Sequence, residues 1–175
     1  MTLGLSLSAF TTLHVIISLV AIAAGLAVFY GMVRGQRMAR WTEAFLLATV
    51  LTSVTGFMFP DIKVGPPFIF GVISLIVLVG AIAGLYLYRL AGAWRLIYVI
   101  GALVALYLNV VVLIVQSFQK LPLLQPLAPT QSEPPFLAVQ LVVMAAFIWF
   151  GYLAGRRFYP AGRTPVVTGR PAVPL

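Results

Sequence analysis

The chain has 175 residues, of which 62% are hydrophobic and only 8% are charged. Soluble domains carry about a quarter charged residues, so this composition excludes an ordinary globular protein. Continuous apolar runs of about 18 residues or more predict a multi-pass helical membrane protein, whereas a β-barrel would show short alternating segments. The chain has no cysteine, which excludes disulfides, zinc-thiolate sites and iron–sulfur clusters.

The apolar runs predict an all-α integral membrane protein, a bundle of five transmembrane helices. The expected spans are about 8–33, 41–59, 67–88, 93–118 and 135–155. Prolines stand at the start of the third and fifth spans, where a missing N–H costs nothing. No basic residue precedes the first run, so we expect this run to be a retained span rather than a cleaved signal. Residues 1–159 are predicted to form one transmembrane domain, and 160–175 a flexible cytoplasmic tail.

The charges predict the orientation. The arginines fall in the 34–40 link, the 89–95 link and the segment after 155. With Glu43, this side carries the whole formal net charge of +8, because Lys63 and Lys120 on the other side are balanced by Asp61 and Glu133. The positive-inside rule therefore places the N-terminus outside and the C-terminus in the cytoplasm. Basic loops beside apolar spans are typical of membrane topology and lipid attraction, so we expect no nucleic-acid partner.

Polar side chains within the spans gather in their predicted outer halves. Burying an amide or imidazole at this depth costs free energy unless the group has a hydrogen-bond partner. Polar residues within membrane spans are therefore treated first as candidates for a functional site. Asn109 and Gln116, seven residues apart, share one face of the fourth span. We expect an outward-facing polar cleft with charges from the adjoining loops at its mouth. The candidate ligand-binding residues are His14, Asn109, Gln116, Gln140, Asp61, Lys63, Lys120 and Glu133.

Structural explanations for the same residues stay open. The amides can tie helices together through hydrogen bonds, and Ser or Thr can bond carbonyls of their own helix. A haem held by two histidines of one chain is excluded by the single histidine, while a haem shared across a dimer, or held by His14 and Met58, stays formally open. GxxxG pairs at Gly80/Gly84 and Gly151/Gly155 suit close helix packing, within the bundle or with a second chain.

No catalytic motif is present. The chain lacks HExxH, GxSxG and Walker A patterns, and no acidic relay follows Glu43 into the membrane. We therefore predict no catalytic residue, no metal site and no cofactor, and we expect a protein that is not an enzyme. Its expected partners are membrane lipids and a small-molecule ligand, with oligomerisation through the glycine pairs as an open alternative.

Four stretches carry a family resemblance: TLHVIISLVAIAAGL, WTEAFLLATVLTSVTGFMFP, GAWRLIYVIGALVALYLNV and APTQSEPPF. They resemble uncharacterised small multi-pass proteins of the bacterial inner membrane. The resemblance implies the same location and a retained first span. The family has no established activity, so the resemblance implies no binding or catalytic role.

The leading functional hypothesis is a non-enzymatic membrane protein whose cleft binds a small molecule, a lipid or a quinone-like head group. The first alternative is an accessory or scaffolding subunit of a larger membrane complex. The second is a small transporter or membrane-embedded enzyme.

Overall fold

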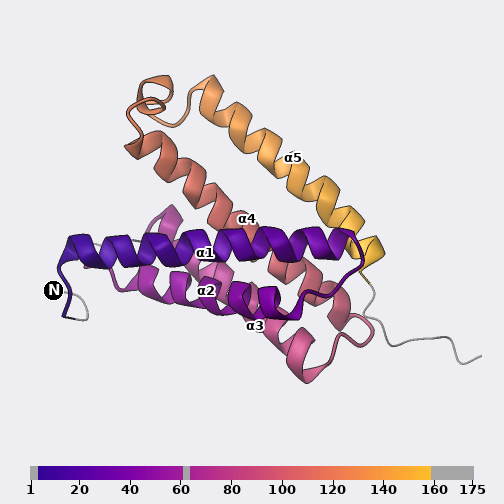
Figure 1. The fold of residues 1–175 in the computed structure, drawn as a ribbon. Coiled ribbons are helices and arrows are strands. Elements are labelled where there is room, and N and C mark those ends of the chain that lie inside the picture. Colours follow the sequence, from indigo (N-terminus) through magenta and orange to yellow (C-terminus); the bar gives the residue numbers. More distant parts are fainter. Residues whose placement is uncertain (1–3, 61–63, 159–175) are drawn as a thin grey trace, which may run out of the picture.

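The computed structural model describes residues 4–60 and 64–158. Every regular element in these ranges is helical (Figure 1). The elements are α1 Leu7–Val33, α2 Ala39–Phe57, α3 Pro66–Ile82 with the π-helical turn η1 Ala83–Leu87, α4 Trp94–Lys120, the short 3-10 helix η2 Gln125–Leu127, and α5 Pro134–Arg157. The five long helical segments begin and end within two residues of the predicted spans.

Four of these segments are long and apolar enough to cross a membrane: α1, α3 with η1, α4 and α5. These four helices support a multi-pass membrane protein. The remaining helix, α2, has 19 residues and carries Arg40 and Glu43 near its start, together with several threonines. Its polar content separates it from the other four.

Local sequence explains where the helices start and turn. The Ser6 hydroxyl accepts a hydrogen bond from the Ala9 N–H and caps α1. Pro66 begins α3 and Pro134 begins α5, as helix-initiating prolines do. Gly35, at φ +70°, lets the chain reverse between α1 and α2.

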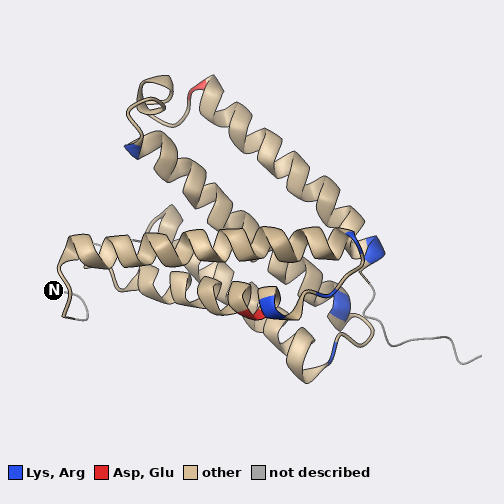
Figure 2. Cartoon of the chain, viewed as in Figure 1, with Lys and Arg blue, Asp and Glu red and all other residues tan. Residues whose placement is uncertain are grey.

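The described arginines gather at one end of the bundle, where α1 and α5 end and where α2 and α4 begin (Figure 2). We call this the arginine end and the opposite one the distal end. Lys120 and Glu133 lie at the distal end (Figure 2). The charge asymmetry of the sequence is therefore also an asymmetry in space.

The apolar core joins α1, α2, α3 and α4 at close helix crossings. At Gly101 of α4, an added Cβ would lie 2.7 Å from the Val77 carbonyl oxygen of α3. At Gly25 of α1, it would lie 2.6 Å from Leu106 of α4. Small residues allow this approach between membrane helices. The side chains around these crossings form the main cluster, which includes Phe45, Leu78, Tyr98, Val99 and Leu106.

The four glycines of the predicted pairs face α4 within the same chain. A Cβ at Gly84 would meet the Trp94 carbonyl at 2.8 Å, and one at Gly151 would meet Leu103 at 3.2 Å. Gly80 and Gly155 likewise have α4 side chains as their nearest neighbours. The glycine pairs therefore serve packing inside the bundle, and their use toward a second chain stays a prediction.

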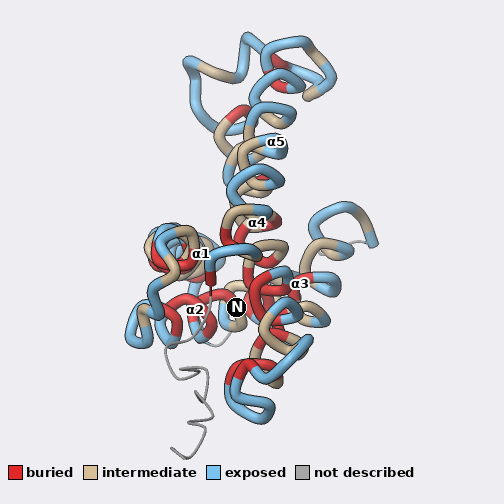
Figure 3. Tube along the Cα trace, turned by 90° about the vertical axis from the view of Figure 1, so that its right-hand side faces the viewer, coloured by how far each residue is buried: buried red, intermediate tan, exposed pale blue. Residues whose placement is uncertain are grey.

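Helix α5 is the least buried of the five long helices (Figure 3). Only 6% of its most apolar window is buried, against 50% for α4. Its arginine end is fixed, because the Arg95 guanidinium donates to the carbonyls of Gly155 and Phe158 at 2.7 and 2.8 Å. Its distal end packs on α4 through Phe118 and Phe136. Toward the distal end, the α4–α5 hairpin leans away from α1 (Figure 1).

Candidate functional site: a polar cavity among four helices

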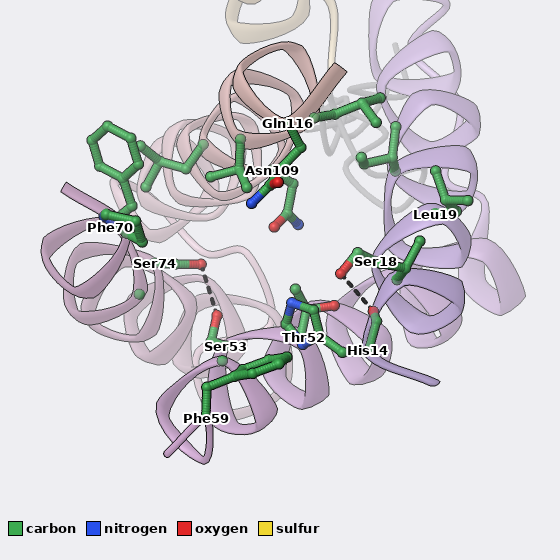
Figure 4. Close-up of a pocket in the computed structure, with 18 of the residues that line it drawn as sticks. His14, Ser18, Leu19, Thr52, Ser53, Phe59, Phe70, Ser74, Asn109 and Gln116 are labelled. Atoms are coloured by element: carbon green, nitrogen blue, oxygen red, sulfur yellow. Dashed lines mark hydrogen bonds between the residues drawn. The ribbon is translucent and has the colours of Figure 1, made fainter. Parts of the chain in front are cut away.

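A cavity of about 790 Å³ lies among α1, α2, α3 and α4 in the distal half of the bundle. Pockets of roughly 300–1,000 Å³ are typical of small-molecule sites. Much of its wall is apolar, including Ile22, Phe57, Phe70 and Leu108. Its polar side chains converge from all four helices (Figure 4): Thr11, His14, Ser18, Thr52, Ser53, Ser74, Asn109, Gln116, Ser117 and Lys120.

His14 is held in a defined orientation on the α1 wall. Its Nδ1 lies 2.7 Å from Thr55 Oγ1, and its ring packs edge-on against Phe59 with centroids 5.3 Å apart. The Thr55 hydroxyl lies 2.7 Å from the Leu51 carbonyl oxygen, to which it donates its only proton. That hydroxyl can then only accept from His14, so the hydrogen-bond network assigns the proton to Nδ1. The tautomer leaves Nε2 as the acceptor of a ring that lines the cavity.

Helices α2 and α3 face each other across a pair of buried serines. The Ser53 hydroxyl donates to the Ser74 hydroxyl at 3.3 Å, which links the two helices beside the cavity (Figure 4). The neighbouring Thr52 differs. Its Oγ1 is buried and has no hydrogen-bond partner among the residues that the structure describes. Such a hydroxyl is an unused donor and acceptor at the cavity wall.

Helix α4 contributes two amides from one face. Both amides, Asn109 and the exposed Gln116, point into the cavity (Figure 4). Asn109 Nδ2 is buried, and no described residue accepts a hydrogen bond from it. Buried polar groups in native proteins are nearly always paired, so each exception needs an explanation. The Asn109 amide and the Thr52 hydroxyl give the cavity two unsatisfied polar groups.

Of the remaining predicted site residues, only Lys120 lines the cavity among those that the structure describes. Lys120 lines the cavity at its distal end and is exposed. Asp61 and Lys63 fall outside the described ranges. Gln140 lies on α5, is half-buried, and is not among the residues that line this cavity.

Glu133 caps the turn before α5 instead of lining the cavity. Its carboxylate accepts from the Thr130 N–H and hydroxyl at 3.0 and 2.8 Å, and from the Ser132 N–H at 3.0 Å. Partial desolvation acts to raise the pKa of Glu133, but these hydrogen bonds dominate and hold the pKa below its ordinary value. Glu133 therefore stabilises the α4–α5 connection.

Thr52, Ser53 and Ser74 belong to the polar side chains expected in the outer halves of the spans, but neither they nor Thr11 are among the candidate ligand-binding residues, although all four line the cavity. Hydroxyls in a membrane helix most simply bond their own helix, as Thr55 and Ser18 do here. Nothing in the spacing of Thr52 along α2 sets it apart. Its unpaired state depends on the positions of the neighbouring helices.

The chemistry of the cavity is that of neutral polar groups. It presents imidazole, hydroxyl and amide groups within an apolar wall, with one described charge, Lys120, at the distal end. Among residues 4–60 and 64–158, no three His, Asp or Glu side chains gather as a metal site would require. Such a site can bind and orient a polar head by hydrogen bonds.

Comparisons with family models, with curated proteins and with solved structures find no match to this chain.

Proposed function

We propose that this chain is a non-enzymatic integral membrane protein that binds a small molecule, a lipid or a quinone-like head group in the cavity among α1, α2, α3 and α4. The observation that carries this proposal is the pair of unsatisfied groups at the wall, Asn109 Nδ2 and Thr52 Oγ1. An unpaired buried polar group costs on the order of 1–3 kcal/mol, and a ligand that pairs with it recovers that cost.

The volume and composition of the cavity support the same function. Its 790 Å³ would accommodate a head group together with part of a hydrocarbon chain. Apolar walls supply the contact area, and the few hydrogen-bonding groups fix the orientation of the bound molecule.

Native mass spectrometry of the protein released from mild detergent tests this proposal. The expected result is a retained small-molecule or lipid mass that Asn109→Leu reduces and Gln140→Leu, the matched amide change outside the cavity, leaves intact. Wild-type protein that carries no adduct and gains none when membrane extract is added back would refute ligand binding.

We further propose that α2 is the fifth span and that the arginine end faces the cytoplasm of a bacterium. At about 1.5 Å per residue, the 19 residues of α2 extend about 28 Å, close to the hydrocarbon thickness of a bilayer. The cysteine-free chain allows single-cysteine labelling. Gln125→Cys is expected to react with an impermeant reagent in intact cells, and Gln36→Cys only after lysis; the reverse pattern would invert the orientation.

The second candidate function is an accessory subunit of a larger membrane complex. The sparse burial of α5 favours it, because the exposed face includes Trp149, Phe150 and Tyr152. This function predicts that a fixed partner co-purifies in mild detergent. A monodisperse protein without a partner would contradict it.

A further inference from the structure

Several lining residues of the cavity are exposed on the side formed by α1 and α4. These helices touch where Gly25 meets Leu106, and they diverge from there toward the distal end (Figure 1). Buried Ile22 and Leu108 line the cavity just beyond the crossing. Farther along, the lining residues become exposed, with Leu19 of α1 at 47%.

Leu113 of α4 is likewise both a lining residue and 37% exposed. Val15, one turn from Leu19, is 43% exposed and also lines the cavity. Side chains that face both a cavity and the outside mark its rim. This part of the rim is apolar and is formed by α1 and α4.

The depth of this rim in the membrane determines which molecules can enter the cavity past it. Leu19 is twelve residues from the start of α1 at Leu7, or about 18 Å along the helix axis. The hydrocarbon core of a bilayer is about 30 Å thick, so Leu19 lies near its middle if α1 spans it. An opening at that depth meets lipid chains.

Polar groups adjoin the apolar rim. Ser18 precedes Leu19 on α1, and Gln116 lies one turn from Leu113 on α4; both line the cavity with Asn109. An amphiphile entering between α1 and α4 could therefore place its head against the amides while its chain stays between the two helices.

The charge of the cavity restricts the head group. Its one described cation, Lys120, is exposed at the distal end. An anionic head beside Asn109 would be buried without a counter-charge, which is strongly unfavourable. The unpaired Asn109 Nδ2 donor suits a carbonyl or ether oxygen. The Nε2 acceptor of His14 suits a hydroxyl.

We infer that the cavity takes an uncharged amphiphile, with hydroxyl and carbonyl groups on its head and a hydrocarbon chain, which enters sideways from the bilayer between α1 and α4. This inference rests on the proposed function and adds the ligand class and the entry route.

A photoreactive monoacylglycerol, with a diazirine in its chain and a terminal alkyne, tests both points in proteoliposomes. We expect labelling of the α1 and α4 segments around Leu19 and Leu113, and competition by excess monoacylglycerol. The fatty acid of the same chain length at neutral pH is expected to compete poorly. Equal competition by this carboxylate would overturn the uncharged head.

The entry route is tested by Leu19→Trp, which adds bulk at the exposed rim. Labelling is expected to be lost in Leu19→Trp and retained in Val20→Trp, an equally exposed neighbour on α1 that does not line the cavity. Leu113→Trp repeats the test from α4, so that a folding defect in one variant does not decide the result. Labelling retained in both rim variants would overturn the side entrance.

A ligand without a long chain separates a test of the amphiphile inference from a test of the proposed function. Monoacetin has the same glycerol head without a long chain. If monoacetin binds the wild-type protein and the monoacylglycerol probe does not, the amphiphile inference is refuted while ligand binding stands. If neither probe binds and no native adduct is found, both are refuted.

Discussion

Replacing Asn109 by leucine separates a ligand site from a helix-tying amide, because the two roles predict opposite changes in stability. Asn109 Nδ2 is buried without a described partner. An unsatisfied buried polar group costs on the order of 1–3 kcal/mol, and an apolar side chain of similar size removes that cost. Asn109→Leu is therefore expected to raise the free energy of unfolding of the ligand-free protein by up to about this amount.

The same substitution weakens ligand binding. A hydrogen bond within a membrane protein contributes about 0.6–2 kcal/mol. At 1.4 kcal/mol per tenfold change, its loss lowers the affinity by about 3- to 30-fold. Gln140→Leu is the control, because it makes the same chemical change on α5 away from the cavity.

The assay compares thermal unfolding of delipidated wild-type and variant proteins in one detergent by circular dichroism. Binding of the monoacylglycerol probe is measured on the same preparations. A clear fall in the unfolding temperature of Asn109→Leu, with unchanged probe binding, would assign Asn109 to helix packing and not to a ligand site.

Three further predictions concern the packing of the helices and the α4–α5 connection. Gly101→Leu forces its Cβ to within 2.7 Å of a carbonyl oxygen of α3, so stability should fall by about 1–3 kcal/mol or more in thermal unfolding. Arg95→Met removes two charge-assisted hydrogen bonds to the end of α5, and proteolysis at Arg157 should become faster. Because the pKa of folded Glu133 lies below the ordinary 4.5, its stabilisation of the α4–α5 turn is complete above that value and is lost as the pH falls through the lower folded pKa. Amide exchange at Thr130, measured relative to an unstructured reference peptide, should lose protection in this acidic range, and Glu133→Gln should remove that pH dependence.

The glycine and arginine substitutions each have a control variant. Gly80→Ala places its Cβ 3.4 Å from a flexible Ile97 methyl group and is expected to be tolerated. Arg156→Met removes an exposed arginine whose guanidinium donates to the Tyr152 hydroxyl of the same helix, so the end of α5 should stay protected. Wild-type behaviour of Gly101→Leu would contradict the close α3–α4 crossing.

The sequence alone predicted the helical segments closely. The length of an apolar run and helix-starting residues such as Pro66 and Pro134 are local features of the chain. The sequence therefore predicts the ends of the long helices to within two residues. Helix α2 is more polar than the other four long helices, and only those four are long and apolar enough to cross a membrane. That α2 is a fifth span is therefore a proposal.

The candidate site was only partly predictable. Helical periodicity placed Asn109 and Gln116 on one face, and the structure brings this face to the same cavity as His14. Gln140 satisfies the same depth and residue-type criteria but lies on α5, which contacts α4 and the arginine end of α1. Depth along a helix could not reveal this difference.

Apolar helices of defined length, with the basic residues gathered at one end, follow from the residues alone, because hydrophobicity, proline and arginine act through each residue's own chemistry. Which polar groups meet depends on how the helices pack. Close helix approaches at Gly25 and Gly101 fix how the helices pack, and beside the cavity Asn109 Nδ2 and Thr52 Oγ1 have no hydrogen-bond partner in the part of the chain that the structure describes.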